Sequence, residues 1–251
     1  MSKILTKIIL VFIILNFFLT NGYAQALDTG SWNNFEGKIG KNDCSLSLYL
    51  FKDRSIKGNY AFKIGGNKIL LQGYLKANAI FLTELKPGNS VFKGNLFTDT
   101  LDKFEGTRID GLKKEVLLFH FKLSSIEWGE YGHRYTDMFG TDDEIETFMQ
   151  TVKTAILSDN KNWLADHIHY PTRHILRKGY TSINNKLQLI KYYEQIFTAK
   201  FKEKIKSDYT TNLFCKGGEV MLGDGEIWIS NTPNSIEHKY DFIINAINPP
   251  N

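Results

Sequence analysis

The segment HIHYPTRH at 167–174 places three histidines within eight residues. Imidazole nitrogens bind zinc and exchange protons near neutral pH, but a zinc site needs three or four ligands that converge. We expect His167 to end a helix, Pro171 to prevent its continuation and His174 to lie in the strand that follows. The three rings then diverge. The pattern predicts no metal site and favours a structural use, with His174 in a ligand pocket as the alternative.

The segment GDGEIWIS at 223–230 is the second candidate, because it places carboxylates close to a tryptophan. In an extended strand, Asp224, Glu226 and Trp228 would share one face. A carboxylate beside Trp228 on an inward face would have a raised pKa, as a general acid or base requires. The alternative is that GDG forms a turn or bulge and Glu226 is solvated. Glu226 is the best candidate for a catalytic residue, and no catalytic role is assigned.

Compact signatures of other enzymes are missing from the sequence. It has no G-x-S-x-G elbow, no phosphate-binding loop and no dinucleotide fingerprint, and no histidine adjoins either cysteine. The lysine-rich segment KFKEKIK at 200–206 is typical of the solvated end of a helix, with a partner-binding patch as the alternative. We therefore expect no cofactor.

The first 26 residues have the pattern of a secretory signal peptide. Lys3 and Lys7 precede an apolar run, and Ala24 and Ala26 form an A-x-A exit. The run is shorter than the roughly 20 apolar residues that a membrane-spanning helix needs. Cleavage is therefore favoured over an anchor, and we expect an exported chain, periplasmic or secreted, with no membrane span after cleavage.

The charge and the cysteines of the remaining chain bear on two questions, whether it binds nucleic acid and whether it forms a disulfide. Loss of the two signal-peptide lysines lowers the formal charge from +4 to +2, which argues against a nucleic-acid partner. Cys44 and Cys215 could form a disulfide in an exported protein, but two free thiols are favoured because the chain is long enough to fold without one.

The first half, 27–125, has the period of β-strands. Apolar and polar residues alternate, and glycine, Asn or Asp separates most of the runs, which favours antiparallel hairpins. An apolar residue, any residue and glycine recur, as at barrel corners. This pattern predicts an antiparallel meander that closes into a small barrel, with an open sandwich as the alternative. The expected strands are 34–40, 44–51, 56–64, 68–76, 78–85, 90–97, 103–109 and 114–123.

The second half changes to a helical period after an aromatic, glycine-rich linker at 126–140. Thr141 and Glu144 have the spacing of a capping box. Helices are expected after Thr141, after Asp159 or Asn160 and from Asn185, followed by strands in 212–230 and 238–247. The region 141–251 is therefore predicted to be an α+β domain that folds separately from the first.

This order of elements, with HYP at 169–171, YTSINNKLQLIKYYEQIF at 180–197 and GEVMLGDGEIWIS at 218–230, resembles the NTF2-like superfamily. The resemblance covers about 141–248 and implies a cone in which a curved sheet wraps around helices and encloses a pocket. The superfamily contains isomerase-like and dehydratase-like enzymes as well as pocket proteins with no reaction. The expected pocket residues are Tyr170, His174, Tyr193, Glu226 and Trp228. More loosely, the first half resembles small eight-stranded lipocalin-like or inhibitor-like barrels.

Two functions follow from these observations. The first is an exported, non-catalytic protein that presents a pocket or surface to a small molecule or a protein partner, as inhibitors and immunity proteins do. The second is an isomerase, dehydratase or hydrolase that uses the cone pocket for acid–base chemistry. The first is favoured, because no convergent acid–base groups can be assigned while 14% of the residues are aromatic. The ligand and the oligomeric state stay open.

Overall fold

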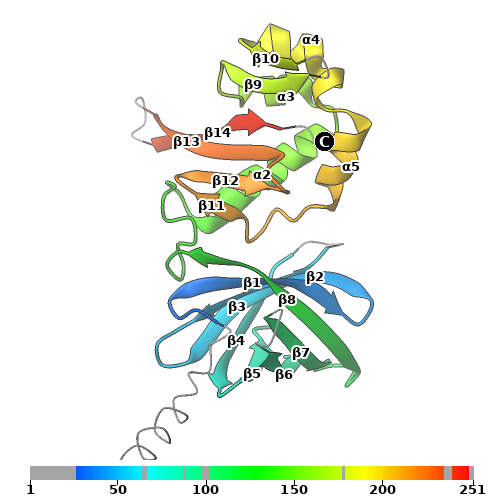
Figure 1. Ribbon diagram of the computed structural model, residues 1–251, viewed down its shortest axis with the longest axis vertical. Helices are drawn as coiled ribbons and strands as arrows, with labels where there is room; N and C mark the ends of the chain where they lie inside the picture. The colour runs from blue at the N-terminus through cyan, green and yellow to red at the C-terminus, as the bar shows by residue number, and fades with distance from the viewer. Residues whose placement is uncertain are drawn as a thin grey trace, which may run out of the picture.

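The computed structural model describes residues 27–63, 67–86, 89–97, 102–176, 179–234 and 239–248. The predicted signal peptide lies outside the described residues. The chain forms two stacked parts along the long axis of the molecule (Figure 1). We call them the barrel, strands β1 to β8, and the α+β part, which follows it in the chain.

Eight antiparallel strands form the barrel. Each strand pairs with the next, and β8 returns to pair with β1, which closes the sheet. The closed barrel predicted from the sequence is confirmed, and the open sandwich is excluded. The strands are β1 (Ser31–Ile39), β2 (Asn42–Leu50), β3 (Ser55–Phe62), β4 (Ile69–Lys76), β5 (Ala79–Glu84), β6 (Val91–Phe97), β7 (Lys103–Ile109) and β8 (Val116–Trp128).

Glycines let neighbouring strands of the barrel approach closely. A β-carbon added at Gly73 would lie 1.8 Å from the backbone oxygen of Phe81, and one at Gly37 would lie 1.9 Å from that of His120. Any side chain at these positions would push the strands apart. The recurrent glycines of the sequence therefore mark places where the curved sheet brings backbones together.

Aromatic side chains fill the inside of the barrel. Phe92, Phe104 and Phe119 are fully buried, and the ring centroid of Phe119 lies 5.7 Å from Phe92 and 4.7 Å from Phe104. Tilted ring pairs at these distances add attraction to the area they bury. These rings are therefore part of a packed apolar core inside the barrel.

One carboxylate lies inside this core. Oε1 of Glu84 accepts hydrogen bonds from the hydroxyl of Tyr60 at 2.5 Å and from Nη2 of Arg108 at 2.9 Å. Burial by itself would raise the pKa of Glu84, but the hydrogen bonds from Tyr60 and Arg108 outweigh it and hold the pKa below its ordinary value.

The α+β part begins with α2 (Asp142–Leu157) at the predicted capping box. Oγ1 of Thr141 accepts a hydrogen bond from the backbone N–H of Glu144 at 3.2 Å, and the Glu144 carboxylate accepts one from the N–H of Thr141 at 2.8 Å. This pairing satisfies two N–H groups at the start of the helix. The buried apolar face of α2 consists of Ile145, Met149, Val152, Ala155 and Ile156.

Three helices and six strands follow among the residues that the structure describes. The strands β11 to β14 form an antiparallel sheet that buries Val220, Leu222, Ile227 and Ile229 in the same apolar cluster as the helices. The elements are α3 (Lys161–Asp166), β9 (Thr172–Leu176), β10 (Gly179–Ile183), α4 (Lys186–Ile196), α5 (Ala199–Ser207), β11 (Phe214–Lys216), β12 (Glu219–Leu222), β13 (Ile227–Asn234) and β14 (Lys239–Ile247).

The helix expected from Asn185 is interrupted in the structure. Thr198 has an extended backbone, and its hydroxyl accepts a hydrogen bond from the N–H of Phe201 at 3.2 Å, so it caps a new helix, α5. Among the described residues, no helix combines the length and the apolar character needed to cross a membrane.

The segment 126–140, predicted to be a linker, is built into the contact between the two parts. Arg134 and Tyr135 are 3% and 0% exposed. The Tyr135 hydroxyl donates to Glu146 at 2.8 Å and accepts from the N–H of Leu213 at 3.0 Å. Even so, the buried apolar residues form two separate clusters, one in each part.

Candidate functional site

The histidine-rich segment starts at the end of α3. His167 ends that helix, its Nδ1 lies 2.7 Å from the backbone oxygen of Trp163, and its ring stacks on the Trp163 indole at 3.9 Å. The exposed His169 joins the sheet through its backbone N–H, which donates to the oxygen of Ile244. Both roles are structural. In the described part of the chain, no group of three His, Cys, Asp or Glu side chains is placed to hold a metal ion.

Tyr170 lies just before the β9–β10 hairpin, and His174 lies within it. The Tyr170 hydroxyl donates to the backbone oxygen of Ala165 at 3.0 Å, and burial, together with the charge of Asp166, raises the pKa of Tyr170 to about 12. His174 pairs with Thr181 in the hairpin, and its side chain lies outside the described residues. Its place in a pocket stays a prediction.

Tyr193 is part of the helical core. It is fully buried, its hydroxyl lies 3.5 Å from the backbone oxygen of Ile156, and the Lys161 ammonium lies 4.8 Å from the centre of its ring. Burial raises the pKa of Tyr193 well above its ordinary value. The hydroxyl is therefore a neutral group within the packed helices.

Glu226 lies in a turn between β12 and β13. Gly223 and Gly225 have positive φ values of 68° and 107°, so the segment turns instead of extending. Oε2 of Glu226 accepts a hydrogen bond from the backbone N–H of Asp224 at 2.7 Å. The turn is thus the correct interpretation of GDGE, but Glu226 is buried rather than solvated, at 6% exposure.

Trp228 lies on β13 opposite Met221, and it is half-buried. Its ring meets that of Phe214 edge-on, with centroids 6.4 Å apart. Tyr193 and Glu226 make their hydrogen bonds with different residues, and a shared pocket of Tyr170, His174, Tyr193, Glu226 and Trp228 stays a prediction.

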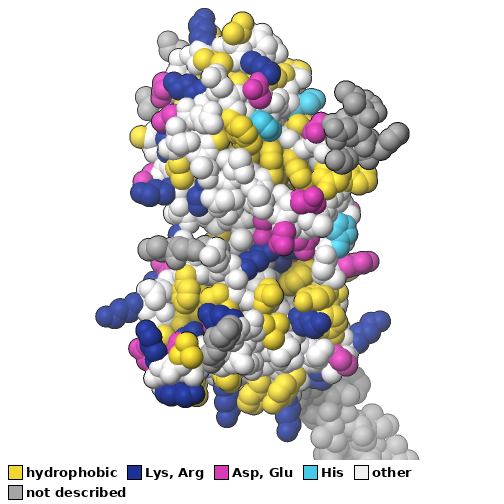
Figure 2. Space-filling model, turned by 180° about the vertical axis from the view of Figure 1, so that it is seen from behind, with side chains coloured by type: hydrophobic (Ala, Val, Ile, Leu, Met, Phe, Trp, Pro, Cys, Tyr) yellow, Lys and Arg dark blue, Asp and Glu magenta, His cyan; other side chains and the backbone are white. Residues whose placement is uncertain are grey.

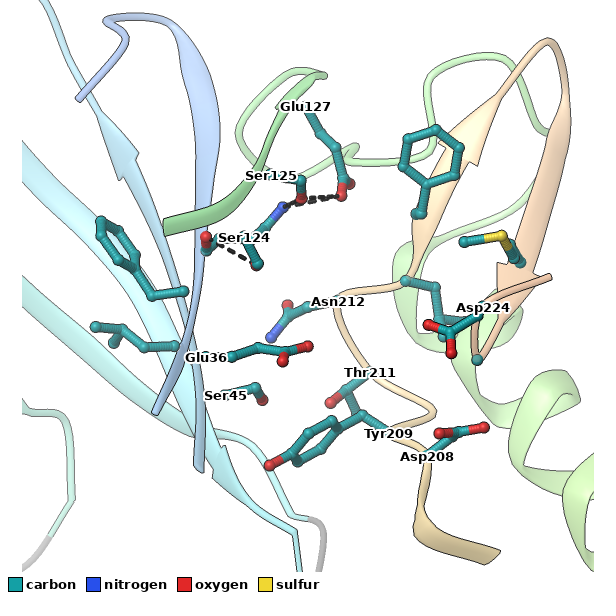
Figure 3. A pocket seen from close by; sticks show the side chains of 17 residues that line it. Glu36, Ser45, Ser124, Ser125, Glu127, Asp208, Tyr209, Thr211, Asn212 and Asp224 are labelled. Atoms are coloured by element: carbon teal, nitrogen blue, oxygen red, sulfur yellow. Dashed lines mark hydrogen bonds between the residues drawn. The ribbon is translucent and has the colours of Figure 1, made fainter. Parts of the chain in front are cut away.

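A cavity of about 280 Å³ lies between the barrel and the α+β part (Figure 3). The outer faces of β1, β2 and β8 form one wall, and the segment after α5 with the β12–β13 turn forms the other. Among the residues that line the cavity are Asn34, Glu36, Ser45, Ser124, Ser125 and Glu127 of the barrel and Asp208, Tyr209, Thr211, Asn212, Phe214, Met221 and Asp224 of the α+β part.

Two hydroxyl groups in these walls have no hydrogen-bond partner among the described residues. They are Oγ of Ser45, on β2, and Oγ1 of Thr211, and both oxygens are buried. Figure 3 shows the two side chains on opposite walls, close to Glu36 and Asn212. A buried polar group without a partner costs about 1–3 kcal/mol. A ligand that supplies hydrogen bonds here would recover that free energy.

The charge in the cavity is negative. Its four charged lining residues are all carboxylates, Glu36 and Glu127 on the barrel side and Asp208 and Asp224 on the other. Glu36 and Asp224 are exposed, whereas the Asp208 side chain is only 13% exposed. Such a wall attracts cations and repels anions.

Two lysines lie behind the carboxylates of the α+β wall. Nζ of Lys153 donates to the backbone oxygen of Asp208 at 2.5 Å. Nζ of Lys204 is 2.9 Å from Asp208, 3.4 Å from Asp224 and 3.8 Å from Glu226. Burial raises the pKa of Asp208, and the charges of Glu226 and Asp224 act in the same direction, while Lys204 opposes them. Two ammonium groups for three carboxylates leave a net negative charge at this wall.

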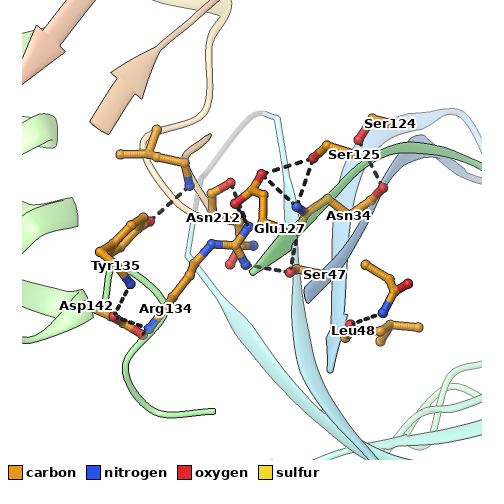
Figure 4. Close-up of polar contacts among 12 residues, drawn as sticks. Asn34, Ser47, Leu48, Ser124, Ser125, Glu127, Arg134, Tyr135, Asp142 and Asn212 are labelled. Atoms are coloured by element: carbon orange, nitrogen blue, oxygen red, sulfur yellow. Dashed lines mark hydrogen bonds and ion pairs between the residues drawn. The ribbon is translucent and has the colours of Figure 1, made fainter. Parts of the chain in front are cut away.

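Arg134 lies buried between the barrel and the α+β part (Figure 4). Its guanidinium donates to Ser47 and to Asn34, both at 2.8 Å, and to Glu127 at 2.9 Å. Burial raises the pKa of Glu127 more than Arg134 and Ser125 lower it. This network fixes the wall that Asn34 and Glu127 share with the cavity.

Comparison with known proteins shows no family for this chain. No family model matches the sequence. No curated protein matches it. The crystal structure of a rhizavidin–biotin complex is similar with a TM-score of 0.33 and 8% identity, over 39% of this chain and 97% of that chain. Function therefore has to be inferred from the site.

Proposed function

We propose that this chain is a non-catalytic binding protein whose ligand is a small organic cation held between the barrel and the α+β part. The observation that carries the proposal is the cavity itself, because its charged lining residues are all carboxylates and two of its buried hydroxyls lack partners. An ammonium or guanidinium group could bind Glu36 or Asp224, and polar atoms of the same ligand could bind Ser45 and Thr211.

The size of the cavity supports a small molecule over a protein partner at this position. Its volume of about 280 Å³ lies near the lower end of ligand pockets, which span roughly 300–1,000 Å³. Tyr209 and Phe214 add aromatic surface to the lining. The lining thus combines carboxylates, hydroxyls and aromatic rings, which suits an organic cation.

Binding can be tested with matched probes of different charge. We expect 1,4-diaminobutane, choline or guanidinobutylamine to bind in calorimetric titrations, and 1,4-butanediol and succinate not to bind. The double variant Glu36→Gln/Asp224→Asn should weaken binding of the cations by roughly tenfold or more. Glu203→Gln, an exposed carboxylate on α5 outside the cavity lining, is the control.

Salt and mass spectrometry sharpen this test. Binding should weaken as the ionic strength rises, because exposed charges are screened, and the ligand should be recovered unchanged. Cation binding that is equal in the double variant and in the wild type would reject the cavity as the site. Binding of none of the probes would reject the proposal.

An acid–base enzyme is the second candidate, and Asp208 favours it. This carboxyl lies at the cavity, and its raised pKa is the property that a general acid or base needs. Asp208 thus joins Glu226 as a candidate, since both lie next to Lys204. Conversion of a bound probe that is lost in Asp208→Asn, with binding retained, would favour this function over simple binding.

We also propose that the α+β part is an NTF2-like cone. In support, the helices pack against one face of the β11–β14 sheet, and a parallel bridge between Ile168 and Ile244 ties the segment before β9 to β14, so the surface of strands continues beyond the sheet. A crystal structure of the protein grown with apolar ligands tests the proposal: a ligand beside Tyr193 and Glu226 would support the cone pocket.

Export and separate folding are further proposals. The pattern of 1–26 supports export, and mass spectrometry of the protein from cells should then find a chain that begins at Gln25 or Leu27.

The two separate apolar clusters support the proposal that the barrel and the α+β part fold independently of each other. Limited proteolysis near the exposed Trp128 should then leave two stable fragments. If both fragments are degraded as soon as the chain is cut, the proposal that the two parts fold independently is contradicted.

A further inference from the structure

The barrel carries exposed aliphatic side chains on one part of its outer surface. Val91, Ile109 and Val116 are direct neighbours across β6, β7 and β8. Leu118 lies two residues beyond Val116 on the same face, and Leu112 lies in the turn that joins β7 to β8. We call Leu85, Val91, Ile109, Leu112, Val116 and Leu118 the aliphatic stripe.

These side chains are open to solvent. Leu112 is 76% exposed, Leu118 is 63% and Val116 is 59%. In Figure 1, β6 and β7 lie on the side of the barrel away from the α+β part, so that part does not cover them. Contiguous exposed apolar surface of this kind marks an interaction site.

Lysines adjoin the stripe. Lys86, Lys93, Lys113 and Lys114 are all exposed, and each is adjacent to a stripe residue or two positions from one. Glu115 is exposed too, whereas Asp110 accepts hydrogen bonds from the backbone of its own turn. On the face seen in Figure 2, hydrophobic side chains and Lys or Arg side chains lie side by side over the barrel.

The charge of the whole barrel has the same sign. Residues 27–128 contain 15 Lys and Arg and 11 Asp and Glu, a formal charge of +4, while residues 129–251 contain 14 and 16, a formal charge of −2. The part of the chain that exposes the aliphatic stripe is thus the basic part. A partner that complements it offers apolar groups beneath a layer of negative charge.

We propose that the aliphatic stripe docks on the surface of an anionic lipid bilayer. Leu112 and its neighbours would insert among the acyl chains near the headgroups, and the lysines would bind lipid phosphates. The composition favours lipid over protein: protein interfaces are enriched in Tyr, Trp and Arg and depleted in Lys, whereas the stripe consists of Leu, Val and Ile beside Lys.

Vesicle flotation tests this proposal with the exported chain after its N-terminus has been determined. The protein should float with vesicles that contain phosphatidylglycerol and much less with vesicles of phosphatidylcholine alone. Lys113→Glu/Lys114→Glu should reduce the partition coefficient by about tenfold or more. Leu112→Ser/Val116→Thr should reduce it by a similar factor, roughly tenfold.

Matched controls come from the α+β part. Leu187 on α4 is 79% exposed, and Leu187→Ser should leave flotation unchanged, as should Lys191→Glu/Lys216→Glu. The proposal is overturned if the wild-type chain ignores anionic vesicles, or if stripe variants and controls float equally. It is also overturned if the stripe variants lose a protein partner while vesicle binding is unchanged.

Discussion

The barrel has two outer faces, one covered by the α+β part and one open to solvent. The open face exposes more aliphatic side chains than is usual, and the covered face makes more polar contacts than is usual. The face covered by the α+β part carries a polar network in which Asn34, Ser47 and Glu127 bind Arg134. A large apolar group beside this network is the buried Trp32, whose ring lies 5.1 Å from the Arg134 guanidinium. The open face exposes aliphatic side chains such as Val116 and Leu118. In most proteins the covered face is the apolar one, because burial of apolar surface drives association.

This reversal indicates that the contact between the two parts is built for geometry. Hydrogen bonds and ion pairs fix orientation and distance, and they leave room for a cavity with a polar lining. The open face, by contrast, has free energy to gain from a partner that buries it. The two faces can be distinguished by how strongly each contributes to stability.

The largest loss of stability is expected from a substitution of Arg134. Arg134→Met removes the guanidinium and leaves the carboxylate of Glu127 buried without its cation, which should lower the free energy of unfolding by about 3–5 kcal/mol. Urea denaturation at neutral pH measures it. Lys161→Met is the control, because Lys161 pairs with the exposed Glu194, and loss of such a pair should cost less than about 1 kcal/mol. If Arg134→Met lowers the free energy of unfolding as little as the control does, the polar face contributes little to stability.

The pH dependence of stability should separate the junction from the barrel interior, since each holds a buried Glu–Arg pair. The pKa of Glu127 is raised and that of Glu84 is lowered, relative to about 4.3 in an unfolded chain. For Glu127, above that value, the folded chain keeps a proton that the unfolded chain has lost, so stability falls as the pH rises towards the folded pKa. For Glu84 the unfolded chain holds the proton first, so its contribution is present above about 4.3 and is lost as the pH falls through the lower folded pKa.

Two isosteric variants test these opposite signs. Glu127→Gln should remove a loss of stability on the alkaline side of about 4.3, and Glu84→Gln should remove a loss on the acidic side. Urea denaturation at a series of pH values, compared with the wild type, gives both profiles. If the difference in stability from the wild type changes with pH in the same direction for both variants, the opposite pKa shifts of Glu127 and Glu84 are contradicted.

Much of the barrel could be predicted from the sequence. Strands with one buried face alternate apolar and polar residues, as Leu46 and Leu48 do with Ser45 and Ser47, and the glycines indicated the curvature. The break between α4 and α5 was missed, because a cap by Thr198 depends on a local hydrogen bond and leaves the helical period of the apolar residues unchanged.

The cavity could not be predicted in the same way. Ser45 and Glu36 lie on the polar face of their strands, where they look like ordinary solvent-exposed residues. Only the contact with a segment more than 150 positions further along the chain turns them into a wall. The run of Asp, Tyr, Thr, Thr and Asn at 208–212 was the one available signal, because polar loops often carry binding residues.

The smallest effect on stability is expected on the open face, and it decides whether the aliphatic stripe serves the fold or a partner. Val116→Thr keeps the β-branched shape, and the side chain is already 59% exposed. Its partner in the register of β7 and β8 is Ile109, and such cross-strand pairs contribute roughly 0.2–1 kcal/mol. Urea denaturation should therefore find a change of no more than about 0.5 kcal/mol, while vesicle binding of the same variant falls. A loss above about 1 kcal/mol would instead mean that the stripe stabilises the barrel itself, and its exposure would then need no partner to explain it.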